Sequence, residues 1–172
     1  MLVAIITGSD SDLKTMQGTV NTLEKLEIPY QVSVLSAHRC TEEVLKYIKE
    51  IEKKGFEVII AAAGKAAHLP GVIAANTSIP VIGIPIETSD LGGLDSLLSI
   101  VQMPKDVPVA TVAIGSAGAV NAAVLALKIL GIKHPSYRKK ADEYRERVKN
   151  EAISRNSIIR ELGFHKYLEK YL

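Results

Sequence analysis

The chain has 172 residues, a formal net charge of +2 and one cysteine, and 47% of its residues are hydrophobic but only 5% aromatic. This length fits one domain with a self-sufficient core, and a core built from Ala, Val, Ile and Leu suits a buried parallel sheet. A single cysteine excludes an intramolecular disulfide and disfavours a metal cluster.

The charge is uneven along the chain, and the sequence argues against two classes of partner. Residues 1–134 carry eleven Lys and Arg against thirteen Asp and Glu, whereas residues 135–172 carry ten against six. No stripe of Lys and Arg with interleaved aromatics indicates nucleic acid. The first apolar run has no cationic region before it, and no apolar run approaches the ~18 residues of a membrane span. We expect a cytoplasmic protein with no nucleic-acid or membrane partner.

Hydrophobic runs and turn residues predict alternating strands and helices. In chain order, these are a strand at 2–7, a helix from Asp10 or Ser11 to about 26, a strand at 30–35, a helix from Thr41 to Gly55, a strand at 58–62, a short helix from about 68 to before 80, and strands at 80–84 and 108–114. Asp10 or Ser11 is expected to cap the first helix and Thr41 the second. The alternation implies a parallel sheet with right-handed crossovers and helices on both faces.

Two later helices do not suit a monomer. Residues 117–130 carry only Asn121 and Lys128 as polar side chains, and a helix apolar on nearly every side must be covered on nearly every side. Residues 135 to about 156 are highly charged and have a narrow stripe of Tyr137, Ala141, Tyr144, Val148 and Ala152. We expect subunits to pack around the first helix and the second to reach a neighbour. The alternative is a monomer with a lidded core.

Three consecutive predicted strands end in polar, Gly-containing loops, at residues 8–12, 36–39 and 64–71. Open parallel α/β sheets bind ligands at the carboxyl ends of their strands, so these loops predict an active site. Residues 8–12 resemble an anion cradle followed by a helix N-terminus, where Asp12 could bind ribose hydroxyls. Plain helix capping by these Ser and Asp side chains is the alternative.

The second loop holds the residues best suited to chemistry. Arg39 offers a planar fork of donors suited to phosphate, and His38 can act as acid or base near neutral pH. A surface His and Arg at a strand end is the alternative. Cys40 lacks an orienting partner for a nucleophilic role.

In the third loop, small residues around Ala66 form a floor for a flat ring, and His68 can contact a carboxylate or cap the short helix. Asp90 and Asp95 are interpreted mainly as turn and cap residues. No set of residues has metal-ligand spacing, and no dinucleotide or phosphate-loop motif is present, so no cofactor is expected. A phosphate site, one or two histidines and an apolar pocket suit proton-transfer or lyase chemistry on a small phosphorylated molecule.

Together these motifs resemble the mutase branch of the PurE family of purine biosynthesis. They are GSDSD at 8–12, SAHR at 36–39, AAHLPG at 66–71, GLDSL at 93–97, SIVQMP at 99–104 and NAA at 121–123. The resemblance implies a flavodoxin-like three-layer α/β/α fold with a parallel sheet. It also implies an α/β catalytic domain at 1–134, and a C-terminal helical extension at 135–172 that packs on a neighbouring subunit in a homo-oligomer, an octamer in this family.

The same resemblance implies an isomerase that converts N5-carboxyaminoimidazole ribonucleotide to 4-carboxy-5-aminoimidazole ribonucleotide, without ATP, metal or biotin. The carbamate would release CO2, C4 of the ring would recapture it, and His38 would relocate the proton. Substrate-binding positions carried over by resemblance are Ser9, Ser11, Asp12, Ser36, Arg39, Gly64, Ala66, His68 and Leu69.

Arg39 and the segment 68–71 separate this chain from a second branch of the family, which carboxylates aminoimidazole ribonucleotide with free CO2. Two positions depart from the family pattern, since Lys65 stands where Gly is usual and Cys40 where Thr is usual. The competing class is a flavodoxin-like binding module, but the sequence lacks an aromatic pair to hold a flavin and the clustered acids of a signalling domain.

Overall fold

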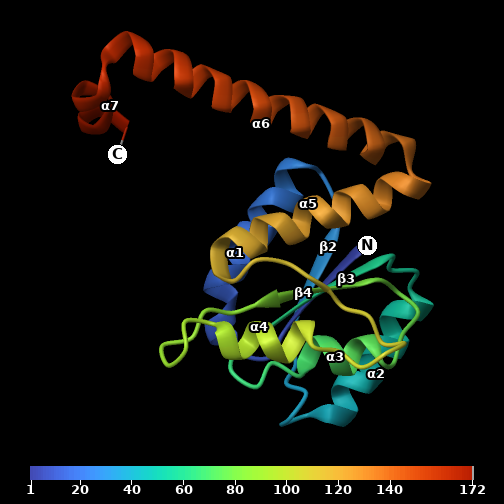
Figure 1. Cartoon of the computed structure of the whole chain (residues 1–172). Coiled ribbons are helices and arrows are strands. Elements are labelled where there is room, and N and C mark those ends of the chain that lie inside the picture. Colours follow the sequence, from blue (N-terminus) through green and yellow to red (C-terminus); the bar gives the residue numbers. More distant parts are fainter. Residues whose placement is uncertain (172) are drawn as a thin grey trace.

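A five-stranded parallel sheet forms the centre of the computed structural model, which describes residues 1–171 (Figure 1). The strands are β1 (Val3–Thr7), β2 (Tyr30–Val34), β3 (Val58–Ala63), β4 (Val81–Pro85) and β5 (Ala110–Thr111), in the order β2-β1-β3-β4-β5. Thr7 of β1 lies opposite Val34 of β2 and Ala62 of β3, so these strands end at the same edge of the sheet.

Helices cover both faces of this sheet, which confirms the three-layer α/β/α architecture. They are η1 (Asp10–Asp12), α1 (Leu13–Lys25), α2 (Thr41–Lys53), α3 (Leu69–Ala74), α4 (Leu94–Val101), α5 (Gly115–Lys133), α6 (Pro135–Leu162) and α7 (Phe164–Tyr171). Alternate residues of β1 point to opposite faces: Ile5 packs in a cluster with α1 and α5, and Ile6 in a cluster with α2, α3 and α4.

The strands β1, β3 and β4 are completely buried, as expected for aliphatic runs covered on both faces. The fifth strand is much shorter than the predicted 108–114, with only Ala110 and Thr111 paired to β4. It lies at the edge of the sheet, and Pro108 has no N–H to donate to a ladder. The helix α4, which sequence patterns did not predict, packs Ile100 into the core beside β4.

The predicted helix caps are wrong in detail. Ser9, not Asp10 or Ser11, occupies the cap position, and its side chain accepts a bond from the backbone N–H of Ser11 at the start of η1. Thr41 is the first residue of α2 rather than its cap, and its hydroxyl donates to the carbonyl of Ala37 at 2.6 Å. Gly55 follows α2 with φ +74°, as its predicted closing role requires.

The apolar helix α5 is covered in part by its own chain, which buries nine of its nineteen residues, and the packing of a second subunit on the rest stays a prediction. Ala119, Ala123 and Leu127 are all fully buried, between the sheet and α1. Gly18 of α1 allows a close approach, and the Thr19 hydroxyl donates to the Ala119 carbonyl at 2.8 Å. By length and composition alone α5 could span a membrane, contrary to the expected absence of such a run, but half of its apolar window is buried in this fold.

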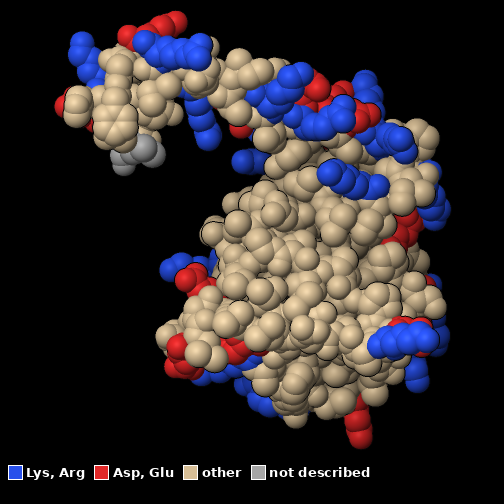
Figure 2. Space-filling view, in the orientation of Figure 1, with Lys and Arg blue, Asp and Glu red and all other residues tan. Residues whose placement is uncertain are grey.

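The helices α6 and α7 form an arm that leaves the globular body (Figure 1). Tyr137, Ala141 and Tyr144 pack against the cluster on α5 and are half-buried, so the first half of the apolar stripe lies partly against its own domain. Beyond them α6 continues to Leu162, past the predicted end near 156, and α7 follows within the predicted helical extension at 135–172. Figure 2 shows charged side chains of both signs along this arm. Apolar side chains on the arm, among them Ile153 and Phe164, remain exposed.

Candidate active site

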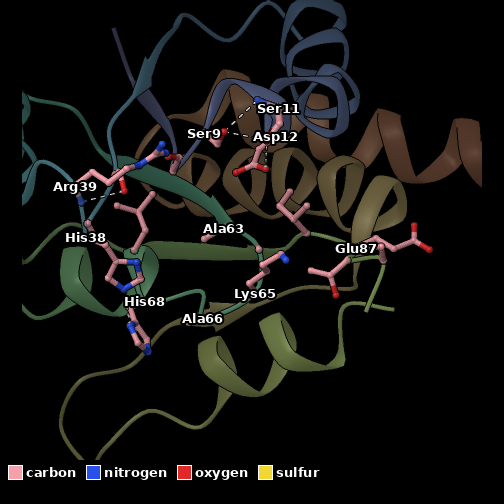
Figure 3. A pocket seen from close by; sticks show the side chains of 18 residues that line it. Ser9, Ser11, Asp12, His38, Arg39, Ala63, Lys65, Ala66, His68 and Glu87 are labelled. Atoms are coloured by element: carbon pink, nitrogen blue, oxygen red, sulfur yellow. Dashed lines mark hydrogen bonds between the residues drawn. The ribbon is translucent and has the colours of Figure 1, made fainter. Parts of the chain in front are cut away.

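A cavity of about 490 Å³ lies at the carboxyl ends of β1, β2, β3 and β4. Its walls are formed by Gly8, Ser9, Ser11, Asp12, Ser36, Ala37, His38, Arg39, Ala63, Gly64, Lys65, Ala66, His68, Leu69, Ile86, Glu87, Thr88 and Ser89. The structure therefore brings together the whole predicted site, since all three predicted loops contribute (Figure 3).

The serine side chains of the loop after β1 cap the following helix and also line the cavity. The Ser11 hydroxyl donates to the Ser9 hydroxyl oxygen at 2.9 Å, and the Thr7 hydroxyl donates to the Ser9 carbonyl at 3.0 Å. Both serines line the cavity, together with Asp12. Capping and ligand binding are thus compatible here, because the same short turn fixes the side chains that face the cavity.

Arg39 connects the first two loops. Its Nη2 donates to the carbonyl of Gly8 at 2.8 Å, and its backbone N–H donates to the Ser36 hydroxyl at 3.3 Å. A guanidinium has five N–H donors in a fixed plane, so the bond to Gly8 orients the group and leaves donors for an anion. The serines of both loops lie beside this cation in the cavity wall, which makes this end of the cavity suitable for phosphate.

His38 and His68 meet in the cavity wall, although they are thirty residues apart in sequence. Nε2 of His38 lies 2.8 Å from Nδ1 of His68, and the two rings are perpendicular, with centroids 4.9 Å apart. In such a contact one nitrogen must carry the proton and the other must offer a lone pair. His68 occupies the N-cap position of α3, but its side chain makes no cap bond and instead partners the other imidazole.

The remaining side chains of earlier interest have structural contacts. The Cys40 thiol donates to the Ser36 carbonyl at 3.3 Å, so the thiol–imidazole alternative gains no support. Asp95 accepts a bond from the Thr88 hydroxyl at 2.8 Å in the first turn of α4, and Asp90 pairs with Lys65 at 3.0 Å. Among residues 1–171, no group of three or more His, Cys, Asp or Glu side chains is placed to hold a metal ion.

Comparison with known families agrees with this geometry. Residues 2–151 match the family model described as AIR carboxylase. The chain belongs to this family, the PurE family.

Relatives of this PurE-family chain are similar over almost its full length. A Thermotoga maritima protein named N5-carboxyaminoimidazole ribonucleotide mutase is 51% identical over 98% of the chain and 97% of its own length. A Pseudomonas aeruginosa protein of the same name is 57% identical over 84% of the chain and 88% of its own length. The crystal structure of Treponema denticola PurE superposes with a TM-score of 0.84 at 26% identity, covering 92% of this chain and 98% of that one.

Sequence patterns missed the fourth wall of the PurE-family cavity. Ile86, Glu87, Thr88 and Ser89 follow β4 and line the cavity, and Figure 3 shows Glu87 across from Arg39 and His38. This segment carries no glycine and no histidine, so it has no motif of its own. The only available signal was its position after a buried strand, because every parallel strand of such a sheet ends at the ligand-binding edge.

Burial at this site perturbs Asp12. Desolvation and, to a smaller extent, the charge of Asp10 raise the pKa of its carboxyl, and together they exceed the lowering by hydrogen bonds from Ser11 and Ser9 and by the charge of Arg39. Because the fold favours the protonated form, ionised Asp12 destabilises the folded state at neutral pH. That penalty begins to decrease as the pH falls through the pKa of Asp12 in the folded protein, and it is gone below the lower pKa of Asp12 in the unfolded chain.

We therefore expect Asp12→Asn to raise the melting temperature at pH 7, with the difference from the unsubstituted protein closing at acid pH. Thermal unfolding followed by circular dichroism at several pH values measures both. Asp10→Asn is the matched control, since Asp10 is exposed and its carboxylate accepts the Ser11 N–H at 3.0 Å. Because the charge of Asp10 contributes to the raised pKa of Asp12, this variant should give only a smaller increase. A lower melting temperature for Asp12→Asn at pH 7 would contradict the argument.

Proposed function

We propose that this chain is an N5-carboxyaminoimidazole ribonucleotide mutase, an isomerase of purine biosynthesis acting in the cytoplasm. The observation that supports it most is the joining of two histidines and an arginine in one cavity. Full-length similarity to proteins that bear this name supports the same substrate.

The cavity offers complementary surfaces for the parts of such a ribonucleotide. Arg39, Ser9, Ser11 and Ser36 would bind the 5′-phosphate, and Asp12 would accept bonds from ribose hydroxyls. Between these groups and the histidines the wall is small and apolar, with Gly64, Ala66 and Leu69 where the flat ring would lie. Leu69 is buried, which helps to exclude water from the ring.

The proposed reaction is balanced without any co-reactant. The carbamate C–N bond breaks, CO2 leaves, and its bonding electrons remain on the exocyclic nitrogen and the conjugated ring. Carbon C4 then attacks CO2, and a C–C bond forms. C4 must lose one proton and the exocyclic nitrogen must gain one, so a single acid–base group can serve both transfers. We assign that group to His38, with His68 as its hydrogen-bonded partner.

Retention of CO2 is the other requirement, because free CO2 would diffuse away between the two steps. The apolar walls exclude competing water.

Conversion of N5-carboxyaminoimidazole ribonucleotide, monitored by absorbance without ATP or added bicarbonate, tests the proposal. The family description favours one alternative, carboxylation of aminoimidazole ribonucleotide by free CO2. Turnover of that compound with bicarbonate, and none of the carbamate, would overturn the mutase assignment.

We further propose that the protein is a homo-oligomer, an octamer by resemblance, with the 135–172 extension packed on a neighbouring subunit. The exposed apolar side chains of the arm, Val148, Ile153, Phe164, Leu168 and Tyr171, support this. Light scattering is expected to give about eight times the 18.6 kDa of one chain. A mass near 18.6 kDa would contradict the assembly without bearing on the chemistry.

A further inference from the structure

Lys65 has an unusual backbone conformation in the wall of the cavity. Its φ is +56°, in the left-handed region that residues with a Cβ rarely adopt. Gly64 precedes it directly after β3, so this tight turn places a long cationic side chain where the strand ends. The position combines backbone strain with charge inside the cavity wall, a combination typical of functional sites.

The ammonium of Lys65 is held by a residue from a different loop. Its Nζ lies 3.0 Å from Oδ2 of Asp90, which follows β4. Both side chains are largely exposed, at 72% and 64% of their surface, so the pair lies at the open rim of the cavity and can separate when a ligand competes. The hydrogen bond that Lys65 donates to Asp90 raises the pKa of Lys65, which favours the charged ammonium.

The two fixed cations of the cavity wall stand on different loops. Arg39 lies beside the serines of the first two loops, whereas Lys65 extends from β3 toward Glu87 (Figure 3). The ribonucleotide of the proposed function also carries two anionic groups, a phosphate at one end and a carboxylate on the ring or its exocyclic nitrogen. With Arg39 assigned to the phosphate, Lys65 is the remaining Lys or Arg side chain among the described residues of the cavity wall that could pair with the carboxylate.

We propose that Lys65 binds the carboxylate of the ribonucleotide, and that Asp90 holds the Lys65 ammonium at the rim until the ligand arrives. This inference rests on the proposed function. Lys65 would interact with the ionised substrate and product but not with neutral CO2, so it contributes to binding and specificity and is not an acid–base group. Asp90 limits that contribution by competing with the carboxylate for the same cation.

Binding of two ribonucleotides tests the proposal, measured by calorimetric titration at low ionic strength. One is 4-carboxy-5-aminoimidazole ribonucleotide, and the other is 5-aminoimidazole ribonucleotide, which lacks the carboxylate. Lys65→Asn removes the charge but keeps a residue that tolerates positive φ. This substitution should lower the affinity for the carboxylated ligand about twofold to fivefold, the range expected for an exposed ion pair. The affinity for the other ligand should not change. Lys65→Arg keeps the charge and should bind both ligands as the unsubstituted protein does.

Asp90→Asn should tighten binding of the carboxylated ligand alone, because its competitor for Lys65 is removed. Unchanged or weaker binding would overturn the holding role of Asp90. Equal affinities of Lys65→Asn and the unsubstituted protein for the carboxylated ligand would overturn the role of Lys65. Equal losses of affinity for both ligands in Lys65→Asn would also overturn the role of Lys65.

Arg39→Lys separates this inference from the proposed function. Loss of the planar guanidinium at the phosphate should lower the affinity for both ribonucleotides by the same factor, independently of any role of Lys65. If the unsubstituted protein binds neither ribonucleotide, the proposed function itself fails. If it binds both and Lys65→Asn changes nothing, only the assignment of Lys65 fails.

Discussion

His38→Asn is expected to lower turnover by about 100-fold or more, while the affinity for the ribonucleotide stays close to that of the unsubstituted protein. Asparagine has a similar polar reach but cannot take and return a proton near neutral pH. The phosphate-binding groups are carried by other side chains, with Arg39 held by the Gly8 carbonyl, so binding does not depend on the imidazole. Steady-state kinetics and a binding titration on the same preparation measure the two effects separately.

His134→Asn is the matched control for this substitution. His134 is likewise hydrogen-bonded, but its partner is Glu57, at 2.8 Å; it is half-buried where His38 is exposed, and it lies outside the cavity wall. It should turn over substrate at the unsubstituted rate. Near-normal turnover of His38→Asn would remove this residue from the mechanism and leave His68 as the remaining imidazole of the cavity.

The sheet and most of the site were predictable because they depend on local pattern. Runs such as residues 3–6 are aliphatic throughout, which is typical of strands buried on both faces, and β1 is buried throughout. Once the strands are parallel, their carboxyl ends must meet at one edge, and the loops after β1, β2 and β3 come together without any knowledge of side-chain contacts. The cavity lining contains every predicted site residue for that reason.

Contacts between distant side chains were not predictable. The bond between His38 and His68 depends on the directions in which two loops present their rings, and sequence spacing carries no information about it. The ion pair of Lys65 with Asp90 is of the same kind, since Asp90 reads locally as a turn residue. The loop after β4 was missed because only its position at the end of a buried strand, and no sequence motif, identifies it as part of the cavity wall.

The apolar helix α5 shows that a pattern hydrophobic on all sides predicts burial but not the element that covers the helix. The pattern requires that residues 117–130 be covered, but it does not name the covering element. In the structure the sheet and α1 bury its Ala119 and Leu127, and α6 packs nearby through Tyr137 and Tyr144. The small side chains that were expected to admit a second subunit instead admit α1 of the same chain, at Gly18.

Ala123→Glu is accordingly expected to destabilise the single chain. Ala123 is fully buried in the core cluster that also contains Ile5 and Leu23, and the described residues around it supply no cation. An uncompensated charge in such a place costs about 3–5 kcal/mol. For a domain of this size that corresponds to a fall in melting temperature of roughly 6–20 °C.

Asn121→Glu provides the matched control, because it adds the same charge two residues earlier on the exposed side of the same helix. It should change the free energy of unfolding by less than about 0.5 kcal/mol. Thermal unfolding and light scattering on both variants separate folding from assembly. If Ala123→Glu kept its melting temperature and lost only its oligomeric mass, Ala123 would contact a second subunit rather than the core. The complete burial of its side chain within one chain argues for the opposite result, a loss of folding stability that precedes any change in assembly.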